Sequence, residues 1–264
     1  MKEDFIDYNI AGIRDLLNIM MDSVNILQRE KMLSENGMEA TETVKYALGL
    51  IARSLTMLDD LREMTYCPGY YSIKNYLETV CAGFRSVCKM FGAEIEVRIC
   101  PEDDENIVFD GAAMEKIFYN CIHILIANCE YEKCKLTISV KNSLNTVTFC
   151  VKNNAPFVGN TTRKDIINNT QNIHNTLSNL DEAYLNKVAA LMNGRVDFCS
   201  GKKSARFEIC IPKNLKLGTT VMKEAETIFA NNEYVMKYEA NPRKYIGIFM
   251  AQMLHNQNKY IIKD

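Results

Sequence analysis

The segment of residues 109–128, FDGAAMEKIFYNCIHILIAN, constrains the fold of this chain more than any other stretch. Asp110 and Gly111 form a turn signal, and the residues after them follow the pattern of a strongly apolar helix. Asn120 and Asn128 lie on its polar side. Because an apolar helix has to bury its face against other elements, we expect this helix to organise the core of its domain.

The elements around this helix predict an α+β sandwich. The pattern predicts one helix over residues 73–91 and another over 180–192, the second ending at Asn193 and Gly194. Alternating apolar and polar residues predict strands, which lie at residues 93–100, 106–109, 136–140, 146–152, 195–199 and 205–211. This order favours a mixed sheet with helices on one face, and Pro212 ends the unit. The polar residues 153–172 are predicted to be a connecting loop.

Two long amphipathic helices precede the sandwich. Residues 8–33 and 39–64 carry apolar residues at steps of three and four, and the SENG sequence at 34–37 separates them. Two such helices with a short connection predict an antiparallel hairpin. A lone hairpin cannot cover both of its apolar faces. It therefore either packs on the rest of the chain or pairs with another copy as a four-helix bundle with two-fold symmetry.

The chain of 264 residues is thus predicted to have three parts. The helical hairpin spans residues 1–67, and Cys67-Pro68-Gly69 marks its boundary with the sandwich at 68–212. Residues 213–264 form a C-terminal extension with helix candidates at 220–232 and 243–255. This extension is either a cap on the sandwich or a separate docking element, and its sequence assigns it no role.

Composition excludes several classes of function. The net charge of −2 favours neither nucleic acid nor an anionic membrane as a partner. No signal segment is evident and no apolar run approaches the ~20 residues of a membrane helix, so we expect a cytoplasmic protein.

The cysteines and histidines predict no metal site. The ten cysteines include no CxxC pair, and His123, His174 and His255 lie near no plausible set of ligands. In a cytosolic chain we expect the cysteines to be small buried hydrophobic residues. Cys150 and Cys210 follow the alternation of their strands, which supports this interpretation.

The order of elements over residues 8–212 resembles the core of a cytoplasmic histidine kinase. The local matches are YYSIKNYLETVCAGFRSVCKMFGAEIEVRI at the join between hairpin and sandwich, MEKIFYN in the central helix, and ALMNGRVDFCSGKKSARFEICIP at the closing hairpin. The resemblance implies a dimerisation and phosphotransfer hairpin followed by a Bergerat-type ATP-binding domain of the GHKL class.

The residues that the family uses for phosphotransfer are absent. A phosphoacceptor has to be a histidine on the first helix, and residues 1–65 contain no histidine. If Arg14 matches the family's arginine in this motif, the acceptor position falls at Ala11.

The central helix would be the N-box helix of the resemblance, where the family places two asparagines four residues apart. Alignment on Asp110 makes Asn120 the first asparagine and puts Ile124 at the second, with Lys116 at the position of the catalytic base. Alignment on Asn128 keeps the second asparagine and puts Ile124 at the first. In either register an aliphatic side chain occupies a position where Mg²⁺ needs an oxygen ligand.

Two further nucleotide motifs also depart from the family. The Asp-x-Gly-x-Gly motif reads Asn153-Asn154-Ala155-Pro156-Phe157, in which Asn153 retains a hydrogen-bond acceptor for adenine but the glycines are lost. The Gly-x-Gly-Leu lid motif reads Asn-Leu-Asp-Glu at residues 179–182, and its carboxylates would repel a triphosphate. We therefore expect no cofactor, no metal and no catalytic residue. Asn120, Asn128 and Asn153 remain as vestigial nucleotide-binding candidates.

Three hypotheses of function follow. The first is a non-catalytic signalling module, a homodimeric pseudo-histidine kinase that binds a response regulator receiver domain or another signalling protein. Its partner surface would lie on the first helix, around Ile10, Ile13, Arg14 and Leu17. The alternatives are a divergent ATP-binding histidine kinase or ATPase, and a histidine phosphotransferase with an unusual site. The simplest reading of Asn120 and Asn128 is that they cap or solvate a core helix.

Overall fold

The computed structural model describes residues 13, 17, 19–27, 35–90, 92–127, 134–155, 171–201 and 203–213. These residues fall into two compact units, and the chain passes from the first to the second between Glu63 and Met64. The predicted extension at 213–264 lies outside the described residues, apart from Lys213.

The first unit contains helix α2 (Glu35–Glu63) and the helical residues described between 13 and 27. Helix α2 begins earlier than predicted, so Asn36 and Gly37 lie in its first turn instead of in a loop. Leu17 shares a buried cluster with Leu48 and Leu55, against which Met21 and Ala52 pack. The two segments therefore have a common hydrophobic core, while the antiparallel hairpin itself stays a prediction.

The second unit is built on a five-stranded sheet of order β2-β4-β5-β7-β6. Strand β2 pairs with β4 in parallel, and every other pair in this sheet is antiparallel, which confirms the mixed sheet. A small antiparallel pair, β1 with β3, stands beside it, and β1 was absent from the sequence prediction. The elements in chain order are β1 (Gly69–Ser72), α3 (Ile73–Met90), β2 (Glu94–Arg98), the 3₁₀ turn η1 (Pro101–Asp103), β3 (Asn106–Phe109), α4 (Gly111–Ala127), β4 (Lys135–Asn142), β5 (Thr146–Asn153), α5 (Gln171–Leu191), β6 (Arg195–Ser200) and β7 (Ala205–Pro212).

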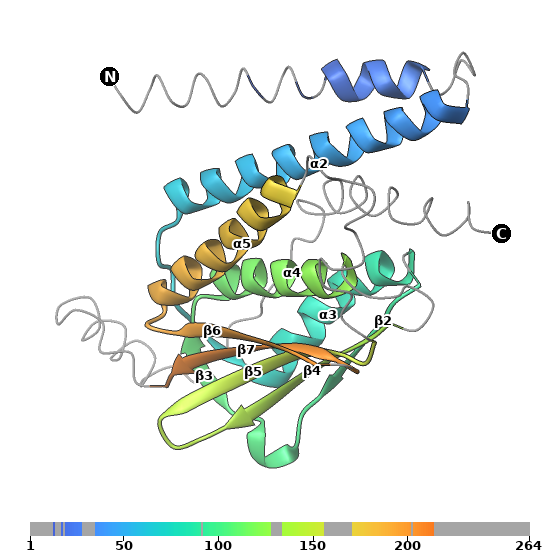
Figure 1. Ribbon diagram of the computed structural model, residues 1–264. Coiled ribbons are helices and arrows are strands. Elements are labelled where there is room, and N and C mark those ends of the chain that lie inside the picture. Colours follow the sequence, from blue (N-terminus) through green and yellow to red (C-terminus); the bar gives the residue numbers. More distant parts are fainter. Residues whose placement is uncertain are drawn as a thin grey trace, which may run out of the picture. The chain divides into compact units, whose positions relative to one another are not determined.

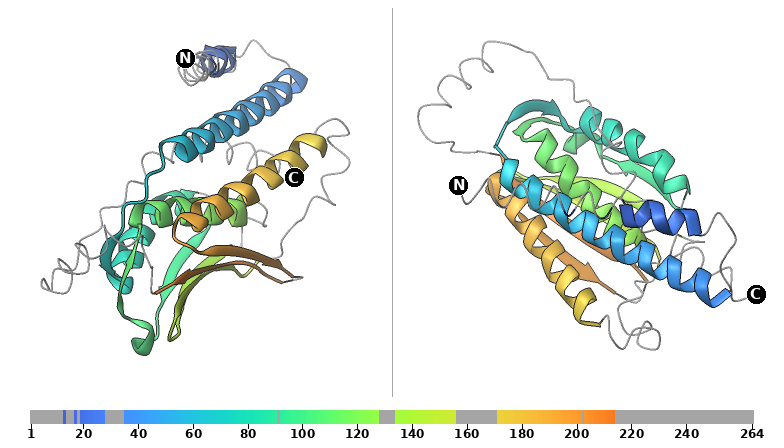
Figure 2. Two further views of the ribbon diagram at one scale, coloured as in Figure 1. Left: turned by 90° about the vertical axis from the view of Figure 1, so that its left-hand side faces the viewer. Right: turned by 90° about the horizontal axis from the view of Figure 1, so that it is seen from above.

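Helices α3, α4 and α5 cover one face of this sheet, as the views in Figures 1 and 2 show. Between the two layers lies an aromatic core. The rings of Phe118 on α4 and Phe149 on β5 meet edge to face with centroids 5.8 Å apart, and Phe109 lies 6.2 Å from Phe149. All three side chains are fully buried. Helix α4 is thus the central helix of the sandwich, as its apolar sequence predicts.

Two of the cysteines predicted to be buried in the core, Cys150 and Cys210, lie instead on the outer face of the sheet. Cys150 and Cys210 point to this face, opposite Glu208 and Thr148 on neighbouring strands, and are only partly buried. Alternation along a strand gives two faces, and the sequence does not say which of them the core covers. The cysteines that do behave as buried hydrophobic residues are Cys81, Cys88, Cys121 and Cys134, whereas Cys67, Cys100 and Cys199 are exposed.

The predicted end of α5 is confirmed. Asn193 adopts a left-handed conformation with φ of 50°, and the amide of Gly194 donates to the carbonyl of Ala189 at 2.9 Å. This is the usual way in which a helix closes its last carbonyls. The helix begins at Gln171 rather than near 180, so the end of the predicted loop is helical.

Within the described residues, every helix is too short or too polar to cross a bilayer.

Candidate nucleotide site

Asp110 begins the central helix. Its Oδ1 accepts a hydrogen bond of 2.9 Å from the amide of Ala113, which is the N-cap bond of α4. Its Oδ2 accepts from the amide of Cys67 at 2.7 Å. The cap was foreseeable from the Asp-Gly sequence, but the bond to Cys67 was not, because that partner lies 43 residues earlier in the chain.

Asn120, the first N-box asparagine in the alignment on Asp110, faces protein. Its side chain is buried, and its Nδ2 donates to the carbonyl of Lys116 on the same helix at 2.9 Å. Ile124, one turn further, is partly buried and offers no oxygen to a metal. Asn128 lies outside the described residues.

Asn153 ends strand β5 with no exposed surface, and both ends of its amide contact the backbone of other elements. Oδ1 accepts from the amide of Ala205, at the start of β7, at 2.6 Å. Nδ2 donates to the carbonyl of Leu125 in α4 at 3.5 Å. The group that would recognise adenine in the resemblance therefore ties two strands and the central helix together.

The residues at the position of the lid motif lie well inside helix α5, which begins at Gln171. Only the first four amides of a helix lack a partner within it. The amides of residues 179–182 therefore take part in the helix instead of forming a phosphate cradle. Burial and the Asp181 carboxylate raise the pKa of Cys121, so this negative charge lies close to α4.

At these positions Ile124 is aliphatic, the amide of Asn153 is engaged with the backbone, and residues 179–182 belong to helix α5. Across the described residues, histidine, cysteine and carboxylate side chains form no group of three or more that could hold a metal ion.

His123 is also part of the protein interior. It is buried on α4, and its ring centroid lies 6.2 Å from that of Tyr119. His174 and His255 lie where no side chain is described.

The candidate partner residues of the first helix have different environments. Ile13 is exposed, whereas Leu17 is buried in the cluster with Leu48 and Leu55. Ile10 and Arg14 lie outside the described residues, as does Ala11 at the acceptor position.

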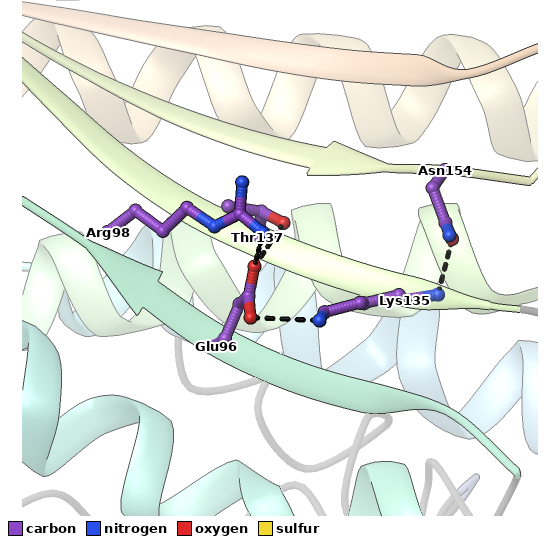
Figure 3. Close-up of polar contacts among 5 residues, drawn as sticks. All are labelled: Glu96, Arg98, Lys135, Thr137 and Asn154. Carbon is purple, nitrogen blue, oxygen red and sulfur yellow. Dashed lines mark hydrogen bonds and ion pairs between the residues drawn. The ribbon is translucent and has the colours of Figure 1, made fainter.

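One further polar group, which the sequence did not single out, lies on the outer face of β2 and β4 (Figure 3). Glu96 pairs with Arg98 and with Lys135, at 3.0 Å for the latter, and accepts from the hydroxyl of Thr137 at 3.3 Å. The hydrogen bond from Lys135 lowers the pKa of Glu96. The backbone amide of Lys135 donates to Asn154 Oδ1 at 2.6 Å. All these groups are paired with one another at the surface, so the cluster offers no nucleophile or open ligand set.

Comparison with known proteins supports a fold and no closer relationship. No family model matches the chain, and no curated protein matches it. Among solved structures, the histidine kinase AdeS of Acinetobacter baumannii aligns with a TM-score of 0.50 and 14% identity, over 75% of this chain and 95% of that one. Full-length ShkA in complex with AMPPNP aligns with a TM-score of 0.52 and 16% identity, over 79% of this chain and 45% of that one. The protein therefore has a histidine-kinase-like fold.

Proposed function

We propose that this protein is a non-catalytic signalling module: a homodimeric, cytoplasmic pseudo-histidine kinase that takes no Mg-ATP and binds a response regulator receiver domain or another signalling protein. The observation that carries this proposal is the state of Asn153. Its buried amide joins β7 and α4, so it cannot serve adenine without breaking the sandwich's own hydrogen bonds. The lid residues inside α5 add independent support.

Apolar side chains at heptad spacing support the dimer. In both segments of the first unit, alternate positions of a 4-3 repeat are buried, and these are Leu17, Val24, Leu48 and Leu55. The intervening positions are exposed, and those that would meet a second copy are Met20, Leu27, Val44, Ile51 and Leu58. A four-helix bundle uses both sets, one within each hairpin and the other between hairpins. A second copy of the same surface would cover the exposed set.

The alternative is a divergent ATP-binding kinase or ATPase. Its support is that a protein of similar fold was solved with AMPPNP. A titration of the full-length protein with a fluorescent ATP analogue, with and without Mg²⁺, separates the two. We expect no saturable binding at millimolar nucleotide. Saturable binding that depends on Mg²⁺ and is abolished in Asn153→Ala would overturn the pseudo-kinase proposal.

Partner binding is tested with receiver domains from the same cell. We expect at least one of them to bind the full-length protein, and Ile13→Glu to weaken that binding. Ile26→Glu serves as the matched control, because Ile26 is also exposed but lies outside the heptad positions. Light scattering on each variant shows whether a loss of binding reflects a loss of the dimer. If no receiver domain binds, the receiver part of the proposal is wrong.

A further inference from the structure

The carboxylate of Asp110 joins two segments that are distant in the sequence. It is buried, and its two oxygens accept from two different backbone amides, Ala113 in the first turn of α4 and Cys67 in the segment that follows α2. A negative charge at the start of a helix is favoured by the partial positive charge of the free amides there. One side chain therefore both caps the central helix and holds the incoming chain.

Aromatic residues pack around the start of α4, and the bond from Cys67 to Asp110 is partly buried. The hydroxyl of Tyr76 donates to the carbonyl of Gly111 at 2.7 Å, and the ring of Tyr71 lies 5.0 Å from that of Phe109. Burial, together with the charge of Asp110, raises the pKa of Tyr66 to about 12. A hydrogen bond to a charged group in such a setting is stronger than one at the surface.

The bond between Cys67 and Asp110 matters because Cys67 lies in the short segment between α2 and β1. Helix α2 ends at Glu63 and β1 begins at Gly69. With the amide of Cys67 held by Asp110, only Met64, Thr65 and Tyr66 lie between the end of α2 and this bond. Each residue spans at most about 3.6 Å, so this connection is short.

We propose that Asp110 is a positioning residue that fixes where the chain enters the sandwich, by joining the segment before β1 to the N-terminus of the central helix. Loss of the bond to Cys67 would free the segment that leads to the start of β1. The proposal concerns the chain's own backbone and stands whether or not the protein binds nucleotide.

Asp110→Asn tests this positioning role in the full-length protein, because it separates the two bonds of Asp110. The amide oxygen can still cap Ala113, and asparagine is a good N-cap residue. The amide nitrogen can only donate, so it cannot accept from Cys67. Asp103→Asn is the matched control, since Asp103 also accepts from a backbone amide, that of Asn142, at 2.7 Å.

Chymotrypsin cleavage after Tyr66 under native conditions is the readout. We expect Asp110→Asn to speed this cleavage by on the order of 10- to 100-fold, the equilibrium effect of losing one hydrogen bond to a charged group. Asp103→Asn is expected to be cut at the wild-type rate. Equal cleavage of both variants, with Asp110→Asn folded, would overturn the proposal.

Hydrogen exchange on the wild-type protein provides a second test that does not depend on the variant folding. Cys67 is an exposed residue in an extended segment, yet its amide should exchange at least about tenfold more slowly than that of Thr65. Equal rates at the two amides would show that Asp110 does not hold this segment.

Discussion

Asn153 illustrates how a residue that a resemblance assigns to a ligand can serve the fold instead. The backbone amide of Ala205 donates to its Oδ1, and its Nδ2 donates to the backbone carbonyl of Leu125. These two partners determine the orientation of the side-chain amide. An aspartate at this position would put a second acceptor against the carbonyl of Leu125 in a fully buried site. The asparagine is therefore required by the packing of this sandwich, and its amide oxygen is not available to a ligand.

We expect Asn153→Asp to lower the free energy of unfolding by about 3 kcal/mol, because it buries an uncompensated charge. Asn153→Ala should cost about 1–3 kcal/mol, since it leaves the amide of Ala205 without its acceptor. Urea unfolding of both variants measures these effects. Asn154→Ala is the control, because Asn154 accepts from Lys135 at the exposed surface and its loss should cost about 1 kcal/mol or less. Wild-type stability in Asn153→Asp would contradict the assigned role.

The buried thiols of α3 predict a loss of stability in alkali. Burial raises the pKa of Cys81 and Cys88 from 9.0 to about 12, so the folded state keeps both thiols protonated where the unfolded chain ionises them. The unfolded state is then favoured, and stability is present below pH 9 and falls between pH 9 and about 12. The slope is about 1.4 kcal/mol per pH unit for each thiol.

Urea unfolding at a series of pH values from 7 to 11 checks this slope. Cys88→Val should show a shallower decline above pH 9 than the wild type, because one of the two thiols no longer ionises on unfolding. A decline of equal steepness in both proteins would show that Cys88 does not contribute.

At the scale of elements, the junction of α5 with β6 fixes how α5 meets the sheet. Asn193 closes the helix and Gly194 lies against the neighbouring strand, where an added Cβ would meet the carbonyl oxygen of Cys210 at 2.7 Å and the side chain of Ile211 at 2.9 Å. Since a backbone atom cannot move aside cheaply, glycine is required here for its lack of a side chain.

Gly194→Ala should therefore lower the free energy of unfolding by about 1–3 kcal/mol, as overpacking generally does. Gly201→Ala is a matched control in the next turn of the chain, where the nearest atom would lie 3.7 Å from the added Cβ. It should be neutral or stabilise the protein by up to about 1 kcal/mol. Thermal unfolding of the two variants side by side tests this, and equal stabilities would show that the junction tolerates a side chain.

At the scale of the whole molecule, the exposed apolar side chains at the heptad positions of the first unit are the basis for expecting a homodimer. The buried half of the repeat is covered within one chain, and the exposed half lacks cover within the described residues. Apolar side chains that repeat along one helix face are typical of an interface between helices.

We expect the wild-type protein to be a dimer and Ile51→Glu to convert it to a monomer, because the carboxylate would be buried between the hairpins. Ile26→Glu makes the same change at a similarly exposed isoleucine off the repeat, and should leave the dimer intact. Light scattering over a range of concentrations gives the masses. A wild-type monomer at every concentration would disprove the homodimer.

The sequence by itself determined the architecture of the sandwich. The apolar pattern of residues 109–128, the alternation in the strands and the Asn193-Gly194 stop are local signals, and each gave its element in the structure. The absence of histidine from residues 1–65 and of glycine from residues 153–157 was also readable without coordinates. These features depend on chain-local chemistry, which is why a sequence carries them.

The tertiary structure alone decided what the candidate residues contact. The bonds of Asn153 to Ala205 and Leu125, of Asp110 to Cys67, and the choice of the solvent face for Cys150 join positions far apart in the chain. The periodicity of the sequence predicts on which face of a helix or strand a side chain lies. Its contact partners depend on which other elements pack against that face. For this reason Asn153 could be predicted as an adenine acceptor from its motif position, and only the folded sandwich showed that its amide already holds the backbone together.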